Sequence, residues 1–154
     1  MNRRGWLAAI ALIGAGSVAA ALFAQHRLGM QPCPWCILQR VILCVIALLA
    51  GVGALLPQPV QRWAGWGIVL LSGCGAAAAL YQNRVAAKSA SCDLTLADRI
   101  ISGLGLDAWL PAVFEVRASC ADAAVDVFGV PFELWSLLLF VALAGAAIRL
   151  ARRS

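Results

Sequence analysis

The chain has 154 residues, of which 63% are hydrophobic and 12% charged, and its mean hydropathy is +0.89. A water-soluble domain is about 45–50% apolar and about 25% charged, so this composition excludes an ordinary soluble fold and favours a protein of the lipid bilayer. The net charge of +5 does not indicate nucleic-acid binding, because the basic residues do not gather with aromatic residues on one polar face. The length fits one integral membrane domain over residues 1–154.

Four apolar stretches are long enough to cross a bilayer, which takes about 20 residues of helix. They predict membrane-spanning helices over about residues 6–24, 37–56, 63–81 and 132–148. Helices are expected because lipid offers the backbone no hydrogen-bond partner outside its own segment. The predicted fold class is an all-α membrane protein, a four-transmembrane-helix bundle. The first stretch is too long for the apolar region of a signal peptide, so we expect it to stay as an uncleaved helix.

The charges between these stretches predict their orientation, since short cytoplasmic connections collect lysine and arginine. One side of the bundle holds both termini and the short second connection, with six arginines and no acidic residue: Arg3, Arg4, Arg62, Arg149, Arg152 and Arg153. Six of the seven acidic residues lie within 82–131. We therefore predict cytoplasmic termini, periplasmic loops at about residues 25–36 and 82–131, and a location in a bacterial inner membrane.

This topology divides the cysteines between compartments. Cys33 and Cys36 lie at the first outer loop, and Cys92 and Cys120 lie in the second. Disulfides persist in oxidising spaces such as the periplasm, so the four outer cysteines are either redox-active or structural staples. A four-cysteine zinc site is a third alternative, but structural zinc sites usually draw on two closely spaced pairs, so we predict no metal. The remaining two cysteines, Cys44 and Cys74, lie within helices and are interpreted as small buried hydrophobes.

The stretch PCPWCILQR at residues 32–40 favours redox chemistry over a staple. A C-x-x-C ring is so short that closing it restrains little of the unfolded chain. Such pairs at helix N-termini are typical of thiols that open and close disulfides. Pro34 fits the first turn of a helix, which would place Cys33 near the cap and Cys36 in the first turn.

Arg40 follows Cys36 by one helical turn and shares its helix face. A charged residue inside a membrane span is costly and indicates function by default. The alternative is that Arg40 reaches back to head groups or water. As a functional group, the cation would stabilise a Cys36 thiolate or the anionic reduced form of a lipid-soluble electron acceptor, for which a quinone is the obvious candidate.

The long outer segment carries apolar residues at helical spacing: Leu106, Trp109, Leu110, Val113 and Phe114. No apolar run here is long enough to span, so we predict a short membrane-surface helix in the second periplasmic loop. Pro111 either ends this helix or begins a second short one. It would hold Cys92 and Cys120 close to the lipid surface. Packing of an ordinary loop onto the bundle is the alternative.

The order of these features resembles the DsbB family, the bacterial disulfide bond formation protein B. The likeness rests on four spans, both termini inside, CPWCILQR at the mouth of the second helix, and SCDL, WLPAVFEV, SCAD and FGVPFELW around the later cysteines. It covers nearly the whole chain. The sequence departs from some members after the third span, where YQNRV places Asn83 at a position that carries histidine in them.

The resemblance implies a role for each site residue. Cys92 and Cys120 would form the disulfide that oxidises DsbA, a periplasmic thioredoxin-fold oxidase, with Cys92 forming the mixed disulfide. Cys33 and Cys36 would form a second disulfide that reoxidises the first, with Cys33 bonded transiently to Cys120. Cys36 and Arg40 would contact the quinone, which is expected to be ubiquinone, with menaquinone as a substitute.

Three functional hypotheses follow from the sequence. The first is a quinone-dependent protein-disulfide oxidoreductase that reoxidises DsbA in the bilayer. The second is a DsbB-like paralogue dedicated to a specific client. The third is a non-catalytic membrane scaffold stapled by disulfides or zinc.

Overall fold

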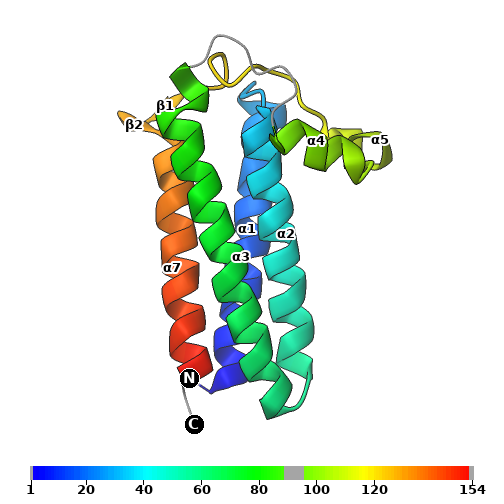
Figure 1. Ribbon diagram of the computed structural model, residues 1–154, viewed down its shortest axis with the longest axis vertical. Helices are drawn as coiled ribbons and strands as arrows, with labels where there is room; N and C mark the ends of the chain where they lie inside the picture. Colours follow the sequence, from blue (N-terminus) through cyan, green and yellow to red (C-terminus); the bar gives the residue numbers. More distant parts are fainter. Residues whose placement is uncertain (1, 89–95, 153–154) are drawn as a thin grey trace.

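The computed structural model describes residues 2–88 and 96–152. Four long helices run side by side as a bundle, and both termini lie at its lower end (Figure 1). These helices are α1 (Arg3–Arg27), α2 (Pro34–Leu55), α3 (Gln58–Arg84) and α7 (Phe132–Arg152). Each is long and apolar enough to cross a membrane. The predicted fold class, an all-α bundle of four transmembrane helices, is confirmed.

The first three helices begin earlier than their apolar runs, because local features of the chain, and not hydropathy, set where each helix starts. The side chain of Asn2 accepts a hydrogen bond from the Gly5 amide at 2.8 Å, which starts α1 well before the predicted limit. The Cys33 side chain caps α2 in the same way. At the far end of the bundle, α3 starts at Gln58, directly after the turn at Pro57. The polar ends of these helices thus extend beyond the apolar runs that identify them.

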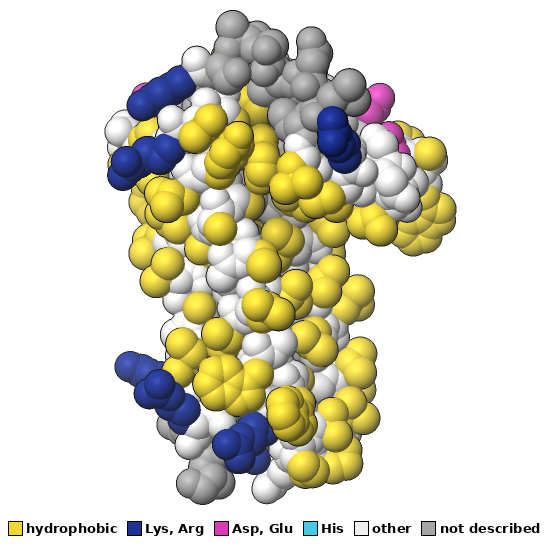
Figure 2. Space-filling model, viewed as in Figure 1, with side chains coloured by type: hydrophobic (Ala, Val, Ile, Leu, Met, Phe, Trp, Pro, Cys, Tyr) yellow, Lys and Arg dark blue, Asp and Glu magenta, His cyan; other side chains and the backbone are white. Residues whose placement is uncertain are grey.

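The bundle sorts its apolar residues into an inner core and an outer surface. The fully enclosed core residues are Leu7, Ile10, Ile46, Ala50, Ile68, Phe140, Leu143, Ala147 and Leu150. Other large apolar side chains, such as Leu12, Leu48 and Leu70, are exposed. Figure 2 shows hydrophobic side chains over the middle of the visible face, with Lys and Arg near its two ends. An exposed apolar band flanked by charges is what a lipid-facing surface requires.

Helices α3 and α7 pack closely because glycines face large side chains. A Cβ atom added to Gly75 would collide with the ring of Phe140, which is completely buried. A Cβ atom on Gly65 would lie 2.6 Å from Leu150 Cδ2. Since lipid supplies no hydrophobic drive between helices, such close approach is a main source of their association.

The second outer loop contains short helices instead of one continuous helix. They are η1 (Ala86–Lys88), α4 (Leu96–Gly103), α5 (Leu106–Trp109) and α6 (Pro111–Phe114). Gly105 separates α4 from α5 with φ of 63°, and Pro111 starts α6 after a break at Leu110. The predicted helix is divided at Pro111, which is one of the two outcomes expected there, because a left-handed residue and a proline both interrupt the helical hydrogen-bond ladder.

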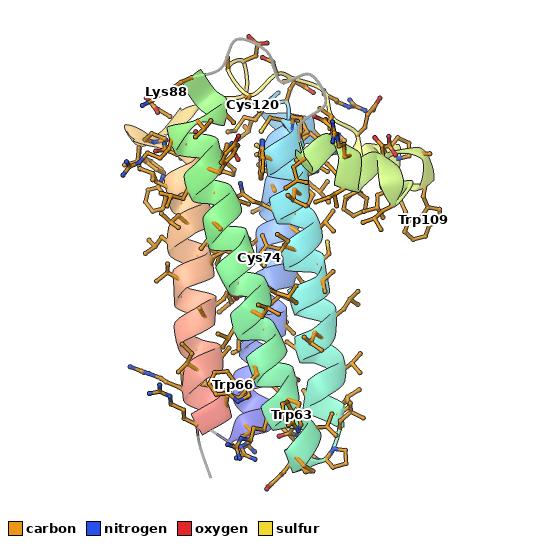
Figure 3. All side chains as sticks on the ribbon, viewed as in Figure 1. Trp63, Trp66, Cys74, Lys88, Trp109 and Cys120 are labelled. Atoms are coloured by element: carbon orange, nitrogen blue, oxygen red, sulfur yellow. The ribbon has the colours of Figure 1, made fainter. Side chains whose placement is uncertain are left out.

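The arm formed by α4, α5 and α6 projects sideways from the upper end of the bundle (Figure 1), with Trp109 at its tip (Figure 3). Its base is fixed to α2, where Ile101 and Phe114 pack against Ile37. Trp109 and Leu104 stay exposed. Exposed apolar residues on the arm fit the membrane-surface placement expected above, which stays a prediction.

A two-stranded hairpin leads into α7. Strand β1 (Asp126–Val127) pairs antiparallel with β2 (Val130–Pro131). The two residues between them, Phe128 and Gly129, have φ of 56° and 76°, as a two-residue hairpin turn of the mirror-image type requires. The hairpin ends where α7 begins, so the start of α7 lies at the outer end of the bundle.

Gly75→Val is expected to destabilise the bundle by about 1–3 kcal/mol, because the added methyl groups must displace the buried ring of Phe140. Gly73→Ala on the same helix is the matched control, since a Cβ atom there has no neighbour within 4 Å. Thermal unfolding of the detergent-solubilised protein measures both. Equal melting temperatures for the two variants would contradict the close α3–α7 packing.

Candidate functional site

Three cysteines meet at the outer end of the bundle. Cys33 and Cys120 are 0% and 1% exposed, and both belong to one buried cluster that Cys36 packs against. The Cys33 and Cys36 sulfur atoms are 2.8 Å apart. Figure 3 shows Cys120 at the upper end of the bundle. Residues that are far apart in the sequence thus form one cluster of three thiols, which is called the thiol group below.

The first turn of α2 determines the positions of Cys33 and Cys36. Cys33 is the N-cap residue, and its sulfur accepts a hydrogen bond from the Cys36 amide at 3.3 Å. Pro34 occupies the first turn, where its missing N–H costs nothing. Trp35 packs against Tyr81 of α3 with ring centroids 4.7 Å apart, which anchors this turn to the neighbouring helix. The two cysteines are therefore held on a rigid helix end.

Backbone hydrogen bonds bring Cys120 to this pair. The amides of Arg117 and Ala118 donate to the Pro32 carbonyl at 3.1 and 3.3 Å. The segment before Cys120 is thereby fastened to the residue before Cys33. Two parts of the chain on different outer loops become neighbours through this contact.

The environment of Cys33 favours its protonated form. Hydrogen bonds with the Cys120 and Cys36 thiols, followed by burial, raise the pKa of Cys33 above its ordinary value. The reduced Cys33 side chain is therefore a thiol, and not a thiolate, at neutral pH. Cys33 and Cys120 are close enough to be hydrogen-bonded, as a direct exchange between them requires.

Two buried glutamines form a chain of hydrogen bonds that ends at Cys36. Gln82 of α3 donates to the Cys36 sulfur at 3.3 Å, and Gln39 of α2 donates to the Gln82 carbonyl oxygen at 2.7 Å. Both side chains are buried. Because Gln39 occupies the oxygen of Gln82, the amide nitrogen of Gln82 must face the sulfur. The arrangement presents a fixed N–H donor to Cys36, which stabilises negative charge on its sulfur.

Arg40 is enclosed by the protein, with 5% of its surface exposed. Its Nη1 atom donates to the Gln25 side chain on α1 at 2.8 Å and to the Val113 carbonyl of α6. Its Nε atom is buried and has no hydrogen-bond partner among the described residues. The guanidinium therefore points into the protein and not towards lipid head groups, so the alternative of a snorkelling Arg40 is wrong.

A cavity of about 250 Å³ lies beside Cys36, lined by residues of α1, α2, α3 and α7. Its chemically active lining residues are Cys36, Gln39, Arg40, Gln82 and Glu133. The rest of the wall is mostly apolar and includes Val18, Ala21, Leu43, Phe132 and Leu139. A mainly apolar cavity with a few converging polar groups is typical of a site for a small organic ligand.

The other cysteines fall outside this group or outside the described residues. Cys92 lies outside the described residues, so its disulfide with Cys120 stays a prediction. Cys74 lies midway along α3, well below Cys120 (Figure 3). It is exposed on the bundle, so its interpretation as a buried hydrophobe is wrong, whereas Cys44 is half-buried. Over residues 2–88 and 96–152, no group of three His, Cys, Asp or Glu residues is arranged to hold a metal ion.

Comparisons with known proteins match this architecture along nearly the whole chain. The family described as "Disulfide bond formation protein DsbB" matches residues 3–150. The chain belongs to the DsbB family. The resemblance deduced from CPWCILQR and the later motifs is confirmed. As a DsbB-family protein, the chain is a membrane protein of disulfide bond formation, which implies disulfide oxidoreductase chemistry.

Individual DsbB relatives have similar lengths. "Disulfide bond formation protein B" of Ralstonia nicotianae is 36% identical over 145 residues, which cover 93% of this chain and 90% of the relative. The protein of the same name from Cupriavidus necator is 32% identical over 155 residues, 99% of this chain and 95% of the relative. "Disulfide bond formation protein B 1" of Pseudomonas syringae pv. syringae is 34% identical over 142 residues, 91% and 84% of the two chains.

Several residues of this DsbB-family site are not among those predicted from the sequence. Gln25, Gln39 and Gln82 hold Arg40 and Cys36 through side-chain hydrogen bonds. Their signal in the sequence is their polarity at the ends of otherwise apolar helices. Glu133 carried a similar signal at the border of the fourth span, and the structure places it in the cavity wall.

Gln82→Leu is expected to slow alkylation of reduced Cys36 about tenfold at neutral pH. The substitution removes the only described side-chain N–H donor to this sulfur, and a hydrogen bond to a charged group contributes about 1.5–3 kcal/mol. Mass spectrometry of the protein treated with iodoacetamide measures the rate. Gln61→Leu removes an equally buried glutamine at the other end of α3 and serves as control. Equal Cys36 rates in both variants would contradict the role of Gln82.

Proposed function

We propose that the chain is a periplasm-facing thiol oxidase that reoxidises a DsbA-like thioredoxin-fold protein and passes the electrons to a membrane quinone. The observation that carries this proposal is the position of Cys36. Its sulfur lies 2.8 Å from the Cys33 sulfur on one side, and the residue lines the cavity on the other. One residue thus connects a chain of thiols with a pocket for a small organic acceptor.

The orientation of the bundle supports a periplasmic site in a bacterial inner membrane. Both termini and the α2–α3 turn lie at the end opposite to the start of α2 (Figure 1), where Cys33 and Cys36 are located. The arginines of the end with the termini follow the distribution of cytoplasmic connections. The cysteines would then face the oxidising compartment, where a disulfide can persist.

Disulfide exchange would proceed in two balanced steps. In the first, the two thiols of the partner reduce the Cys92–Cys120 disulfide, so that the partner gains a disulfide and the chain holds two thiols. In the second, Cys120 attacks the sulfur of Cys33 in the Cys33–Cys36 disulfide and Cys36 leaves as a thiolate. Cys92 then attacks Cys120, which restores the first disulfide and leaves Cys33 reduced. The contact between Cys33 and Cys120 supports this pairing.

The cavity residues fit a quinone head group. Arg40 offers a buried Nε donor that has no partner among the described residues, and the apolar wall suits a ring and its lipid tail. A quinone bound here would accept two electrons and two protons, with ubiquinone expected and menaquinone as a substitute. Arg40 would hold the oxygen of the head group and favour negative charge on it, while Gln82 would stabilise the Cys36 thiolate that faces it.

Purified protein is expected to oxidise a reduced DsbA-like partner only when ubiquinone-1 is added. The Cys36→Ser variant should show no turnover, because electrons would leave the chain when the Cys33 and Cys36 thiols are oxidised to a disulfide, and serine cannot form that disulfide. Loss of partner thiols and ubiquinone absorbance are recorded together. Cys74→Ser is the control, since Cys74 lies away from the thiol group.

Each outcome of that assay assigns a function. Turnover without quinone, or wild-type rates for Cys36→Ser, would contradict the proposal. Activity with one client and none with DsbA-like partners would favour a dedicated paralogue. A stoichiometric bound zinc without thiol oxidation would favour the scaffold.

Arg40→Met is expected to raise the KM for ubiquinone-1 about tenfold or more, because it removes the buried cation and its free Nε donor. Arg27→Met removes an arginine at the end of α1 that does not line the cavity. The two variants are compared by ubiquinone titration at saturating reduced partner. An unchanged KM in Arg40→Met would remove Arg40 from the acceptor site.

A further inference from the structure

Glu133 is an acidic residue within the membrane-spanning part of the protein. It lies in the first turn of α7, and it is the only Asp or Glu of the four long helices. Only 3% of its surface is exposed. It lines the same cavity as Cys36 and Arg40, and it reaches that cavity from the opposite side of the bundle, on α7. A carboxyl group is thus buried next to the proposed acceptor site.

No hydrogen bond or ion pair joins the Glu133 side chain to another residue in the described part of the chain. The Nη1 bonds of Arg40, the other charged residue of the cavity lining, go to Gln25 and to Val113. A buried carboxyl without a structural partner costs stability. Ionisable residues at such positions in membrane proteins are functional by default.

We propose that Glu133 is a catalytic proton carrier, which gives a proton to the acceptor in the cavity and regains one from the periplasmic side. This inference rests on the proposed function. Oxidation of Cys33 and Cys36 to a disulfide releases two electrons and two protons, and reduction of a quinone to a quinol consumes the same number. Glu133 ends each cycle with the proton it started with, so atoms and electrons balance.

The remaining cavity residues are poorly suited to this task. Arginine stays protonated in proteins, and glutamine amides release no proton. Cys36 supplies the electrons. Of the ionisable lining residues, which are Cys36, Arg40 and Glu133, only Glu133 is a free acid–base group. Its position also suits proton exchange with water, because α7 begins directly after the outer hairpin at Pro131.

The first test compares Glu133→Gln with Glu133→Asp, using ubiquinone-1 and the full-length protein. Glu133→Gln keeps the shape and the polarity but cannot carry a proton, so kcat should fall about 100-fold with KM changed less than threefold. Glu133→Asp should recover most of that loss. Glu115→Gln is the control, since Glu115 is exposed and pairs with Arg117 on the outer loop.

The second test follows pH. The pH profile of wild-type kcat should contain a limb that is absent in Glu133→Gln, whereas a limb due to Cys36 remains. Infrared titration of quinone-free protein should show a carboxyl band that Glu133→Gln lacks, with the same midpoint as the kcat limb.

Several results would overturn the inference. The first is a Glu133→Gln variant whose kcat and pH profile equal those of the wild type. The second is a Glu133→Asp variant that recovers no kcat although both variants fold and bind ubiquinone-1. The third is an infrared titration of the carboxyl band whose midpoint differs from the midpoint of the kcat limb. A wild-type protein that reduces no ubiquinone-1 would instead contradict the proposed function, while the infrared titration still reports on Glu133.

Discussion

Burial of the Arg40 guanidinium inside a membrane-spanning bundle is the constraint on which the site depends. A cation removed from water costs several kcal/mol unless polar groups surround it. Gln25 of α1 and the carbonyl of Val113 in α6 provide two of these groups. Because these partners come from a second helix and from the outer loop, solvating one charge also fastens three segments together. The loop that carries Cys120 is therefore tied to the helix that carries Cys33 and Cys36.

The start of α2 combines a structural and a chemical role in the same atoms. The sulfur of Cys33 caps the helix, and the amide it caps belongs to Cys36. Trp35 between them packs on Tyr81, and the carbonyl of Pro32 just before them holds the segment leading to Cys120. The apolar core of the bundle supplies most of the packing. The contacts at the start of α2 determine which cysteine side chains lie next to one another.

The sequence predicts the fold class well, because an apolar run of sufficient length has few structures open to it in lipid. It also predicts how Cys33, Cys36 and Arg40 lie relative to one another, because their spacing at the start of one helix determines their positions. The hydrogen bonds of Gln25, Gln82 and Val113 join distant parts of the chain, and nothing local encodes them. Pro111 predicts the break before α6, because proline interrupts the helical hydrogen-bond ladder, whereas the separate helix α4 was not predicted. The disulfide partner of Cys120 stays a prediction.

The three clustered cysteines, the cavity and the first turn of α7 all lie at one end of a bundle that spans the bilayer. Moving one elementary charge across a full membrane involves about 2.3 kcal/mol per 100 mV. Electrons that pass from Cys36 into the cavity, and protons that enter from the same end, would cross only a small part of that field. The proposed reaction would therefore move almost no charge across the membrane, and its rate would be nearly independent of the transmembrane potential.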